Sequence, residues 1–213
     1  MVKDFHLYVI TGEQFHPGRG YLEVMEEAIL GGADIIQLRE KNKSKKELLE
    51  MARELKKLTT KYDIPFIVND HIDIALAVDA DGIHLGQDDL PLAEARRIMG
   101  PNKIIGISTH ALEEAIEAEK NGADYIGVGP VYETKSKVDV VDPVGLGYVQ
   151  EVVKHTTIPF VAIGGIKLHN LEQVLQAGAK SICVISAIVG AENVKDTATA
   201  FSKRIKQARG EMA

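Results

Sequence analysis

Polar side chains of a kind that binds anions follow one of the short apolar runs of this sequence. Gln37, Arg39 and Lys41 end the run that begins at residue 35, and strict alternation points all three the same way. Arginine offers a planar fork of donors and lysine a point charge, so two cations and an amide suit an anion with several oxygens. A solvated polar loop would carry the same motif, and the motif alone does not separate the two.

Carboxylates follow the next two apolar runs. Asp70 ends one of them, and Asp89 lies a few residues beyond the other. Carboxylates at neighbouring strand ends can share a hard cation, and Mg²⁺ prefers few protein carboxylates together with phosphate oxygens of a substrate. No set of histidines or cysteines accompanies them, which argues against zinc. A structural role competes, because Asp88 or Asp89 could cap a helix that starts at Pro91.

Hydroxyl-bearing residues and glycines form a second group. Thr134, Ser136 and Lys137 lie in a long connection after the sixth apolar run, which we interpret as a candidate lid. Gly165 follows the seventh run and Ser186 the eighth. Glycine has no side chain, so backbone N–H groups can approach phosphate oxygens closely. The start of a helix also favours phosphate, because its free N–H groups point at the oxygens. Together with the cations and carboxylates, this group predicts two anion sites and hence two phosphorylated groups.

Four other residues have side chains that could do chemistry. Ser108 ends the fifth run and could hydrogen-bond a heterocycle, and His110 beyond it could act as a base or begin a helix. His84 lies inside the fourth run, which favours a packed, hydrogen-bonded histidine. Cys183 has apolar neighbours and is expected to be buried.

Short apolar runs rich in Val and Ile alternate with amphipathic stretches from one end of the chain to the other, and these elements must position the polar residues. The runs are residues 6–11, 35–40, 65–70, 82–86, 104–109, 125–130, 159–164 and 181–186, and the clearest amphipathic stretches are 45–62, 112–121, 168–177 and 194–208. Continuous apolar runs are typical of parallel strands that are covered on both faces. The pattern predicts an α/β protein, a (β/α)₈ TIM barrel formed by one domain over residues 1–213, with its site at the carboxyl ends of the strands. An open doubly wound sheet is less favoured, because no G-x-G-x-x-G follows the first run.

Composition narrows the partners. The chain has 213 residues, 45% of them hydrophobic, and a formal net charge of −6 without any Trp, so nucleic acid is not an expected partner. One cysteine cannot form an internal disulfide, and no apolar stretch approaches the ~20 residues that span a bilayer. The first run starts without a preceding signal-peptide cleavage site, so we expect a cytoplasmic protein.

The motifs at the strand ends, taken together, resemble the thiamine-phosphate synthase family. They are QLREK (37–41), ND (69–70), GIHLGQDDLP (82–91), IGIS (105–108), GPVYETKSK (129–137), AIGGI (162–166) and VISAI (184–188). The resemblance implies a transferase of thiamine biosynthesis. Its members join a hydroxymethylpyrimidine diphosphate to a thiazole phosphate and release diphosphate, with Mg²⁺ as the cofactor.

The resemblance also implies a role for each matching residue. The pyrimidine diphosphate would contact Gln37, Leu38, Arg39, Glu40, Lys41, Asn69 and Lys137, with Ser108 beside the pyrimidine, whereas the thiazole phosphate would contact Thr134, Lys135, Ser136, Gly165, Ile185 and Ser186. Asp70 and Asp89 would hold Mg²⁺, and Arg39, Lys41, Lys137 and Ser108 would be catalytic. The family commonly has Thr where this chain has Ser136, and residues 138–142 look longer and more apolar than usual. A homodimer is a further possibility.

Three alternatives compete with the synthase. A class I aldolase would use Lys137 as a Schiff-base amine, although this lysine lies in a polar loop rather than an apolar strand. A thiazole-tautomerase-like protein would share the fold without the reaction, but Gln37, Lys41 and Lys137 beside two aspartates favour the synthase. A non-catalytic ligand-binding regulator would need only one anion site.

Overall fold

Eight short parallel strands pair in chain order and close on themselves, because β1 pairs with both β2 and β8. The computed structural model describes residues 5–136 and 141–211. The strands are β1 (Leu7–Ile10), β2 (Ile35–Leu38), β3 (Phe66–Asn69), β4 (Gly82–Leu85), β5 (Ile104–Thr109), β6 (Tyr125–Val128), β7 (Phe160–Ile163) and β8 (Ile182–Val184). Most of their side chains are buried, as expected for strands covered on both faces.

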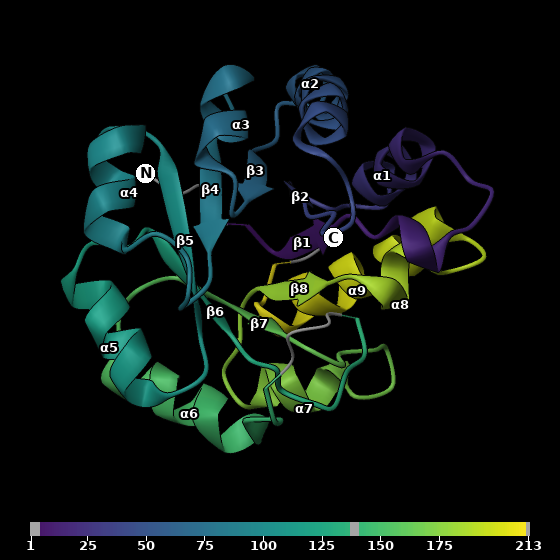
Figure 1. Ribbon diagram of the computed structural model, residues 1–213. Coiled ribbons are helices and arrows are strands. Elements are labelled where there is room, and N and C mark those ends of the chain that lie inside the picture. The colour runs from purple at the N-terminus through teal and green to yellow at the C-terminus, as the bar shows by residue number, and fades with distance from the viewer. Residues whose placement is uncertain (1–4, 137–140, 212–213) are drawn as a thin grey trace.

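Helices follow the strands and form the outer ring of the barrel (Figure 1). They are the 3₁₀ helix η1 (Glu13–Phe15), α1 (Tyr21–Leu30), α2 (Lys45–Lys61), α3 (Ile72–Ala77), α4 (Leu92–Met99), α5 (Leu112–Lys120), α6 (Gly145–His155), α7 (Leu171–Gln176), α8 (Ser186–Val189) and α9 (Val194–Ala208). The predicted (β/α)₈ barrel is therefore confirmed. The pattern of a (β/α)₈ barrel predicts one helix after each strand, and the last unit departs from it, since the short helix α8 lies between β8 and α9. Within the described residues, no helix combines the length and apolar character needed to cross a membrane.

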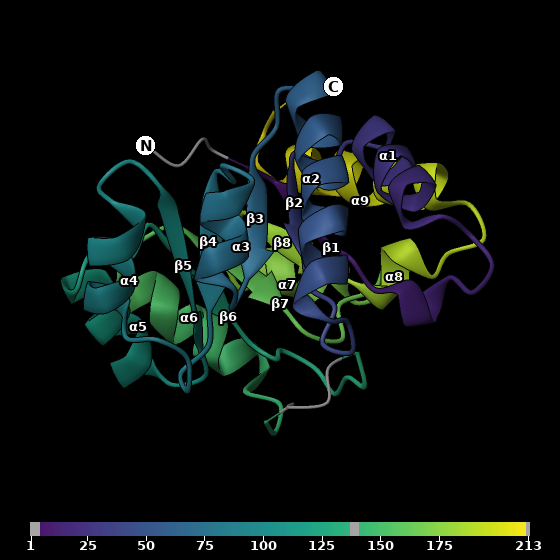
Figure 2. The same ribbon diagram turned by 45° about the horizontal axis from the view of Figure 1, so that its top comes forward.

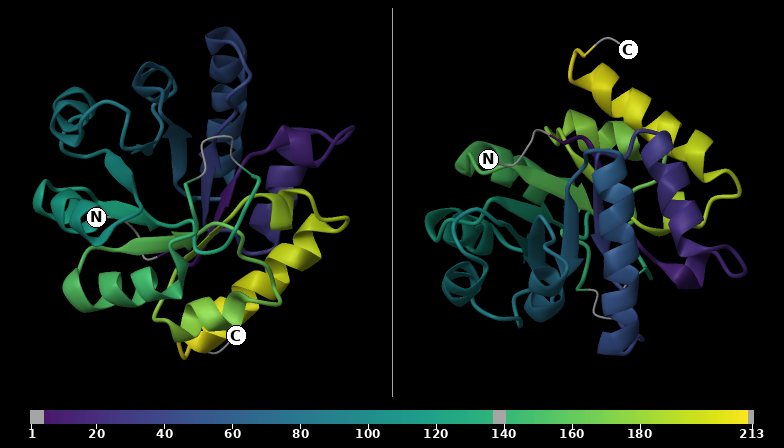
Figure 3. Two further views of the ribbon diagram at one scale, coloured as in Figure 1. Left: turned by 60° about the horizontal axis from the view of Figure 1, so that its bottom comes forward. Right: turned by 90° about the horizontal axis from the view of Figure 1, so that it is seen from above.

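Neighbouring helices seal the ring where the chain begins and ends. α1 and α9 come from opposite ends of the sequence yet lie side by side (Figure 3). A Cβ at Gly31, which ends α1, would lie 2.5 Å from the carbonyl oxygen of Lys195. Only glycine allows this approach, so the first and last units pack closely enough to complete the barrel.

The amphipathic stretch 45–62 folds as α2, beside α3 in Figure 2, and its apolar face is buried against the strands. Ser44 opens it with a capping box: its hydroxyl accepts from the N–H of Glu47, and the Glu47 carboxylate accepts from the N–H of Ser44. We expect Ser44→Ala to lower the free energy of unfolding by about 1 kcal/mol, because the backbone N–H of Glu47 loses its acceptor. Urea denaturation measures this, and an unchanged midpoint would contradict it.

An aromatic cluster fills the barrel at the amino ends of the strands. The ring of Phe5 stands edge-on to Tyr8 and to Tyr125, with centroids 5.9 and 5.8 Å apart. A Cβ at Gly106 would lie 2.1 Å from Cζ of Tyr125, so glycine on β5 leaves the space that this ring occupies. The amino end is thus closed, and the open end of the barrel is the carboxyl end.

Candidate active site

A cavity of about 810 Å³ opens at the carboxyl ends of the strands. Loops from nearly every unit line it, as is general for this fold. Of the residues predicted from the sequence, Arg39, Lys41, Asn69, Asp70, Asp89, Ser108, Thr134, Lys135, Ser136, Gly165, Ile185 and Ser186 belong to its lining. The structure therefore brings the two predicted groups of polar residues together in one cavity.

Three predicted residues lie outside this lining. Gln37 and Leu38 are buried in the barrel wall, and the Glu40 carboxylate accepts from the backbone N–H of Glu13 at 3.1 Å. Burial raises the pKa of Glu40, because a half-buried carboxylate loses hydration. Substrate contact for Gln37, Leu38 and Glu40 stays a prediction. Lys137 and residues 138–140 of the candidate lid lie outside the described residues.

Carboxylates and a lysine form the first half of the cavity, which we call the cation corner (Lys41, Asp70 and Asp89). Lys41 Nζ lies 3.0 Å from Asp70 Oδ2, and Asp89 Oδ2 accepts from the N–H of Gly86 at 2.7 Å. Burial raises the pKa of Asp89, and the neighbouring Asp70 carboxylate raises it further. The charge of these two carboxylates suits a bound cation.

The backbone at Asp70 is strained in a way that serves the cation corner. Asp70 has φ of +59°, a left-handed conformation that few non-glycine residues adopt. Its N–H donates to the carbonyl of His84 at 2.9 Å, which ties the turn after β3 to β4. Strain of this kind persists where surrounding structure fixes it, often at ligand sites. The turn thus brings Asp70 next to Asp89.

A divalent cation fits the donor set of the cation corner. Among residues 5–136 and 141–211, no group of three or more His, Cys, Asp or Glu side chains could hold a metal by itself. Two carboxylates match Mg²⁺, which fills its other positions with water and phosphate oxygens. The competing capping role is not observed, because α4 begins after Pro91 without a side-chain cap.

The second half of the cavity is the hydroxyl corner (Thr134, Ser136, Gly165 and Ser186). Ser136 Oγ and Ser186 Oγ lie 2.8 Å apart, although 50 residues separate them, and Thr134 Oγ1 accepts from the N–H of Ser136 at 3.2 Å. The loops after β6 and β8 therefore meet at this point. Uncharged hydroxyls beside a glycine loop suit a phosphate.

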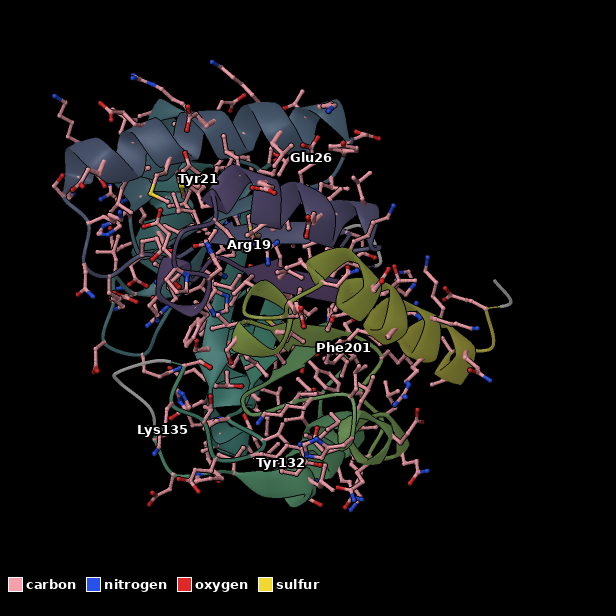
Figure 4. The ribbon with its side chains drawn as sticks, turned by 90° about the vertical axis from the view of Figure 1, so that its right-hand side faces the viewer. Arg19, Tyr21, Glu26, Tyr132, Lys135 and Phe201 are labelled. Carbon is pink, nitrogen blue, oxygen red and sulfur yellow. The ribbon has the colours of Figure 1, made fainter. Side chains whose placement is uncertain are left out.

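Glycines hold the loop after β6 in place. Gly165 has φ of +65°, and a Cβ there would lie 2.6 Å from the carbonyl oxygen of Glu133. The N–H of Tyr132 donates to the carbonyl of Gly164 at 3.0 Å. Figure 4 shows Tyr132 and Lys135 in the lower part of the view, below Arg19 and Tyr21. The glycines thus serve loop packing as well as the lining of the hydroxyl corner.

Ser108 lies between the two corners on the end of β5. Its Oγ is 2.9 Å from Nε2 of His84, and its carbonyl accepts from the side chain of Gln87 at 2.6 Å. The prediction of a packed, hydrogen-bonded His84 is confirmed, as is the burial of Cys183, which also lines the cavity. His110 lies beside Glu114 at the rim.

Sequence reasoning missed Phe15, Glu114 and Lys167, which also line the cavity. Phe15 belongs to η1, directly after β1, and Lys167 follows the glycine loop after β7. Phe15 and Lys167 lie shortly after the carboxyl ends of β1 and β7, a position that could have identified them, whereas Glu114 lies in the first turn of α5.

A closed parallel barrel with a polar cavity at the carboxyl ends of its strands is the architecture of a (β/α)₈-barrel enzyme. Comparison with known proteins specifies the class further. The profile of the family described as thiamine monophosphate synthase matches residues 7–188. The chain belongs to this family.

Individual relatives agree with the family match. The thiamine-phosphate synthase of Halalkalibacterium halodurans is 70% identical, covering 97% of this chain and 98% of the relative. That of Shouchella clausii is 66% identical, covering 97% and 99%. A solved structure, thiamine phosphate pyrophosphorylase from Pyrococcus furiosus, superposes with a TM-score of 0.87 at 44% identity, covering 96% of each chain. The family, the transferase class and the place in thiamine biosynthesis expected from the sequence are confirmed.

Proposed function

We propose that the cavity joins a hydroxymethylpyrimidine diphosphate to a thiazole phosphate, forming thiamine phosphate and releasing diphosphate. The observation that carries this proposal is that the polar lining of one cavity falls into two groups of different chemistry, the cation corner and the hydroxyl corner. Two phosphorylated substrates need two such sites close together. The names of the relatives at 70% and 66% identity support the same reaction.

The cation corner is the proposed diphosphate site. Arg39 and Asn69 line the cavity with Lys41, and these side chains would bind the diphosphate oxygens. Asp70 and Asp89 would hold Mg²⁺, which when bound supplies positive charge to the departing diphosphate. Lys41, now 3.0 Å from Asp70, would turn toward the diphosphate.

The proposed reaction requires stabilisation of the charge on the leaving diphosphate and alignment of the second substrate, rather than a strong base. The pyrimidine amino group donates electrons toward the carbon that bears the diphosphate, so the carbon–oxygen bond can break before the thiazole nitrogen attacks. Arg39 and Lys41 would then face the charge that grows on the leaving group, where preorganised donors are most effective. The hydroxyl corner would hold the second substrate in line.

The hydroxyl corner is the proposed site of the thiazole phosphate, whose charge does not change in the reaction. We expect Ser136→Ala and Ser186→Ala to raise the KM for thiazole phosphate roughly tenfold with little change in kcat, because an interaction equal in ground and transition states affects binding alone. Since the two hydroxyls touch, the double variant should cost less than the sum. A large fall in kcat at unchanged KM would place these residues at the reacting centre.

A coupled assay for released diphosphate tests the proposed function. Diphosphate should appear only when both substrates and Mg²⁺ are present, and omission of either substrate should abolish it. A tautomerase-like protein or a ligand-binding regulator would release none. Borohydride trapping with a carbonyl substrate would reveal a class I aldolase. Homodimer formation and a cytoplasmic location stay predictions.

A further inference from the structure

A chain of five buried or half-buried polar side chains crosses the interior of the barrel and ends at the cavity. The Gln37 amide nitrogen donates to Tyr8 Oη at 2.6 Å, and Tyr8 Oη lies 3.0 Å from Tyr125 Oη. Tyr125 Oη lies 2.9 Å from Nδ1 of His84, whose Nε2 lies 2.9 Å from Ser108 Oγ. These residues come from β2, β1, β6, β4 and β5. Both tyrosines are almost fully buried, and such groups need partners.

The Gln37 amide fixes the direction in which protons are donated along this hydrogen-bond chain. An amide nitrogen has only protons to offer, so Tyr8 Oη accepts from Gln37 and directs its own proton to Tyr125. Tyr125 then directs its proton to Nδ1 of His84. A neutral histidine that accepts at Nδ1 carries its proton on Nε2, where it donates to Ser108. The Ser108 hydroxyl proton is left for another acceptor, and Ser108 lines the cavity.

Burial and ring packing around Tyr8 and Tyr125 maintain the direction of the hydrogen-bond chain. Burial raises the pKa of both Tyr8 and Tyr125 above the ordinary value for tyrosine, so each hydroxyl keeps its single proton at neutral and slightly alkaline pH. Gly106 leaves room for the Tyr125 ring, and Phe5 packs edge-on against both tyrosines. The His84 ring lies 5.5 Å from that of Tyr125, tilted by 32°. The hydroxyls therefore have little freedom to change partners.

We propose that Tyr8, Tyr125 and His84 are positioning residues whose one-way hydrogen-bond chain makes the Ser108 hydroxyl a donor toward a ring nitrogen of the pyrimidine. A neutral aminopyrimidine offers such an unprotonated nitrogen. The inference rests on the proposed function for the identity of the ligand, whereas the direction of the chain is a property of the unliganded protein.

The state of His84 tests the direction without any substrate. In ¹⁵N NMR spectra of the histidine-labelled protein at slightly alkaline pH, the His84 signals are assigned by their absence from His84→Gln. We expect a neutral ring with the proton on Nε2. Tyr125→Phe should shift His84 toward the Nδ1–H form, because Nδ1 loses its donor. An Nδ1–H or doubly protonated ring in the wild type overturns the proposal, as does an unaltered tautomer in a folded Tyr125→Phe.

Tyr148→Phe is the matched control. Tyr148 is also buried, and its hydroxyl lies 2.8 Å from both Thr109 Oγ1 and the carbonyl oxygen of Ala111, neither of which belongs to the hydrogen-bond chain. It should lose stability as Tyr125→Phe does, yet keep the His84 tautomer of the wild type. A change in the tautomer of Tyr148→Phe would mean that the tautomer reports general loosening, and would overturn the proposal.

Substrate analogues test the link to Ser108. Two pyrimidine diphosphates, each with one ring nitrogen replaced by C–H, are compared with the parent compound. In the wild type one analogue should lose roughly tenfold in kcat/KM, the value of one hydrogen bond, and this loss should shrink in Tyr125→Phe and vanish in Ser108→Ala. An equal loss in all three proteins overturns the proposal. Failure of the proposed function would instead show as no turnover of the parent compound, with the His84 result intact.

Discussion

Arg39→Ala is expected to slow the single-turnover release of diphosphate by about 100-fold or more, while the Kd for thiazole phosphate stays near the wild-type value. Loss of one donor that faces charge growing in the transition state typically costs ~3–4 kcal/mol. The loop should keep its shape, because the N–H of Arg39 donates to Thr11 Oγ1 at 2.9 Å whatever the side chain. Rapid-quench measurement with both substrates saturating gives the rate of the chemical step.

Arg97→Ala provides the matched control for this experiment. Arg97 lies on α4, exposed and paired with Glu94 away from the cavity, so its loss should leave the rate unchanged. A wild-type single-turnover rate in Arg39→Ala would show that Arg39 does not face the leaving group. The family resemblance predicts the same slow step for Lys137→Ala.

Asp70→Asn and Asp89→Asn are each expected to weaken Mg²⁺ and pyrimidine diphosphate binding together, by at least about 100-fold for the metal. Side chains behind a metal ligand are already worth about 10- to 100-fold in affinity, so a direct ligand should be worth no less. Diphosphate oxygens would complete the coordination, which couples the two ligands thermodynamically. Calorimetric titration of Mg²⁺ with and without the diphosphate substrate measures both effects.

Asparagine keeps the fold in these variants. Asp70 has φ of +59°, a conformation that asparagine tolerates better than most residues, and loss of one charge relieves the repulsion with Asp89. Asp79→Asn is the matched control, because Asp79 also has a positive φ, +52°, and pairs with Lys103 outside the cavity lining. Full activity in excess chelator, or wild-type Mg²⁺ affinity in both variants, would refute the metal assignment.

Periodicity predicted the helices well where they are long. The stretch 194–208 folds as α9 with the same bounds, because one apolar face recurs over several turns. The helix α8 was missed: its four residues continue the apolar run of β8, and no side chain caps it. Four residues are too few to reveal a helical period.

The ends of the strands were predicted too long, and this changed the interpretation of the site. Alternation along the run 35–40 predicts that Gln37, Arg39 and Lys41 all point the same way, but β2 ends at Leu38. Gln37 therefore points into the barrel toward Tyr8, while Arg39 and Lys41 line its mouth. Asp70 was likewise placed in a strand, although its left-handed backbone already belongs to a turn.

The two corners of the cavity were predictable, whereas the buried chain was not. Polar residues at strand ends meet because a parallel barrel brings all carboxyl ends to one side. Contact between Tyr8 and Tyr125, 117 residues apart, depends on ring directions inside the barrel that no spacing in the sequence reports. Tyrosines in apolar runs look like core residues until their hydroxyls are seen to meet.

The central claim is that one cavity holds two separate anion sites at the same time. Calorimetric titration of thiazole phosphate, first into the protein alone and then into protein saturated with Mg²⁺ and inorganic diphosphate, tests it most directly. Diphosphate should fill the cation corner and leave the hydroxyl corner open, so thiazole phosphate should bind with a stoichiometry of about one in both titrations. Displacement of thiazole phosphate by diphosphate would show that the two share one site, and would contradict the account.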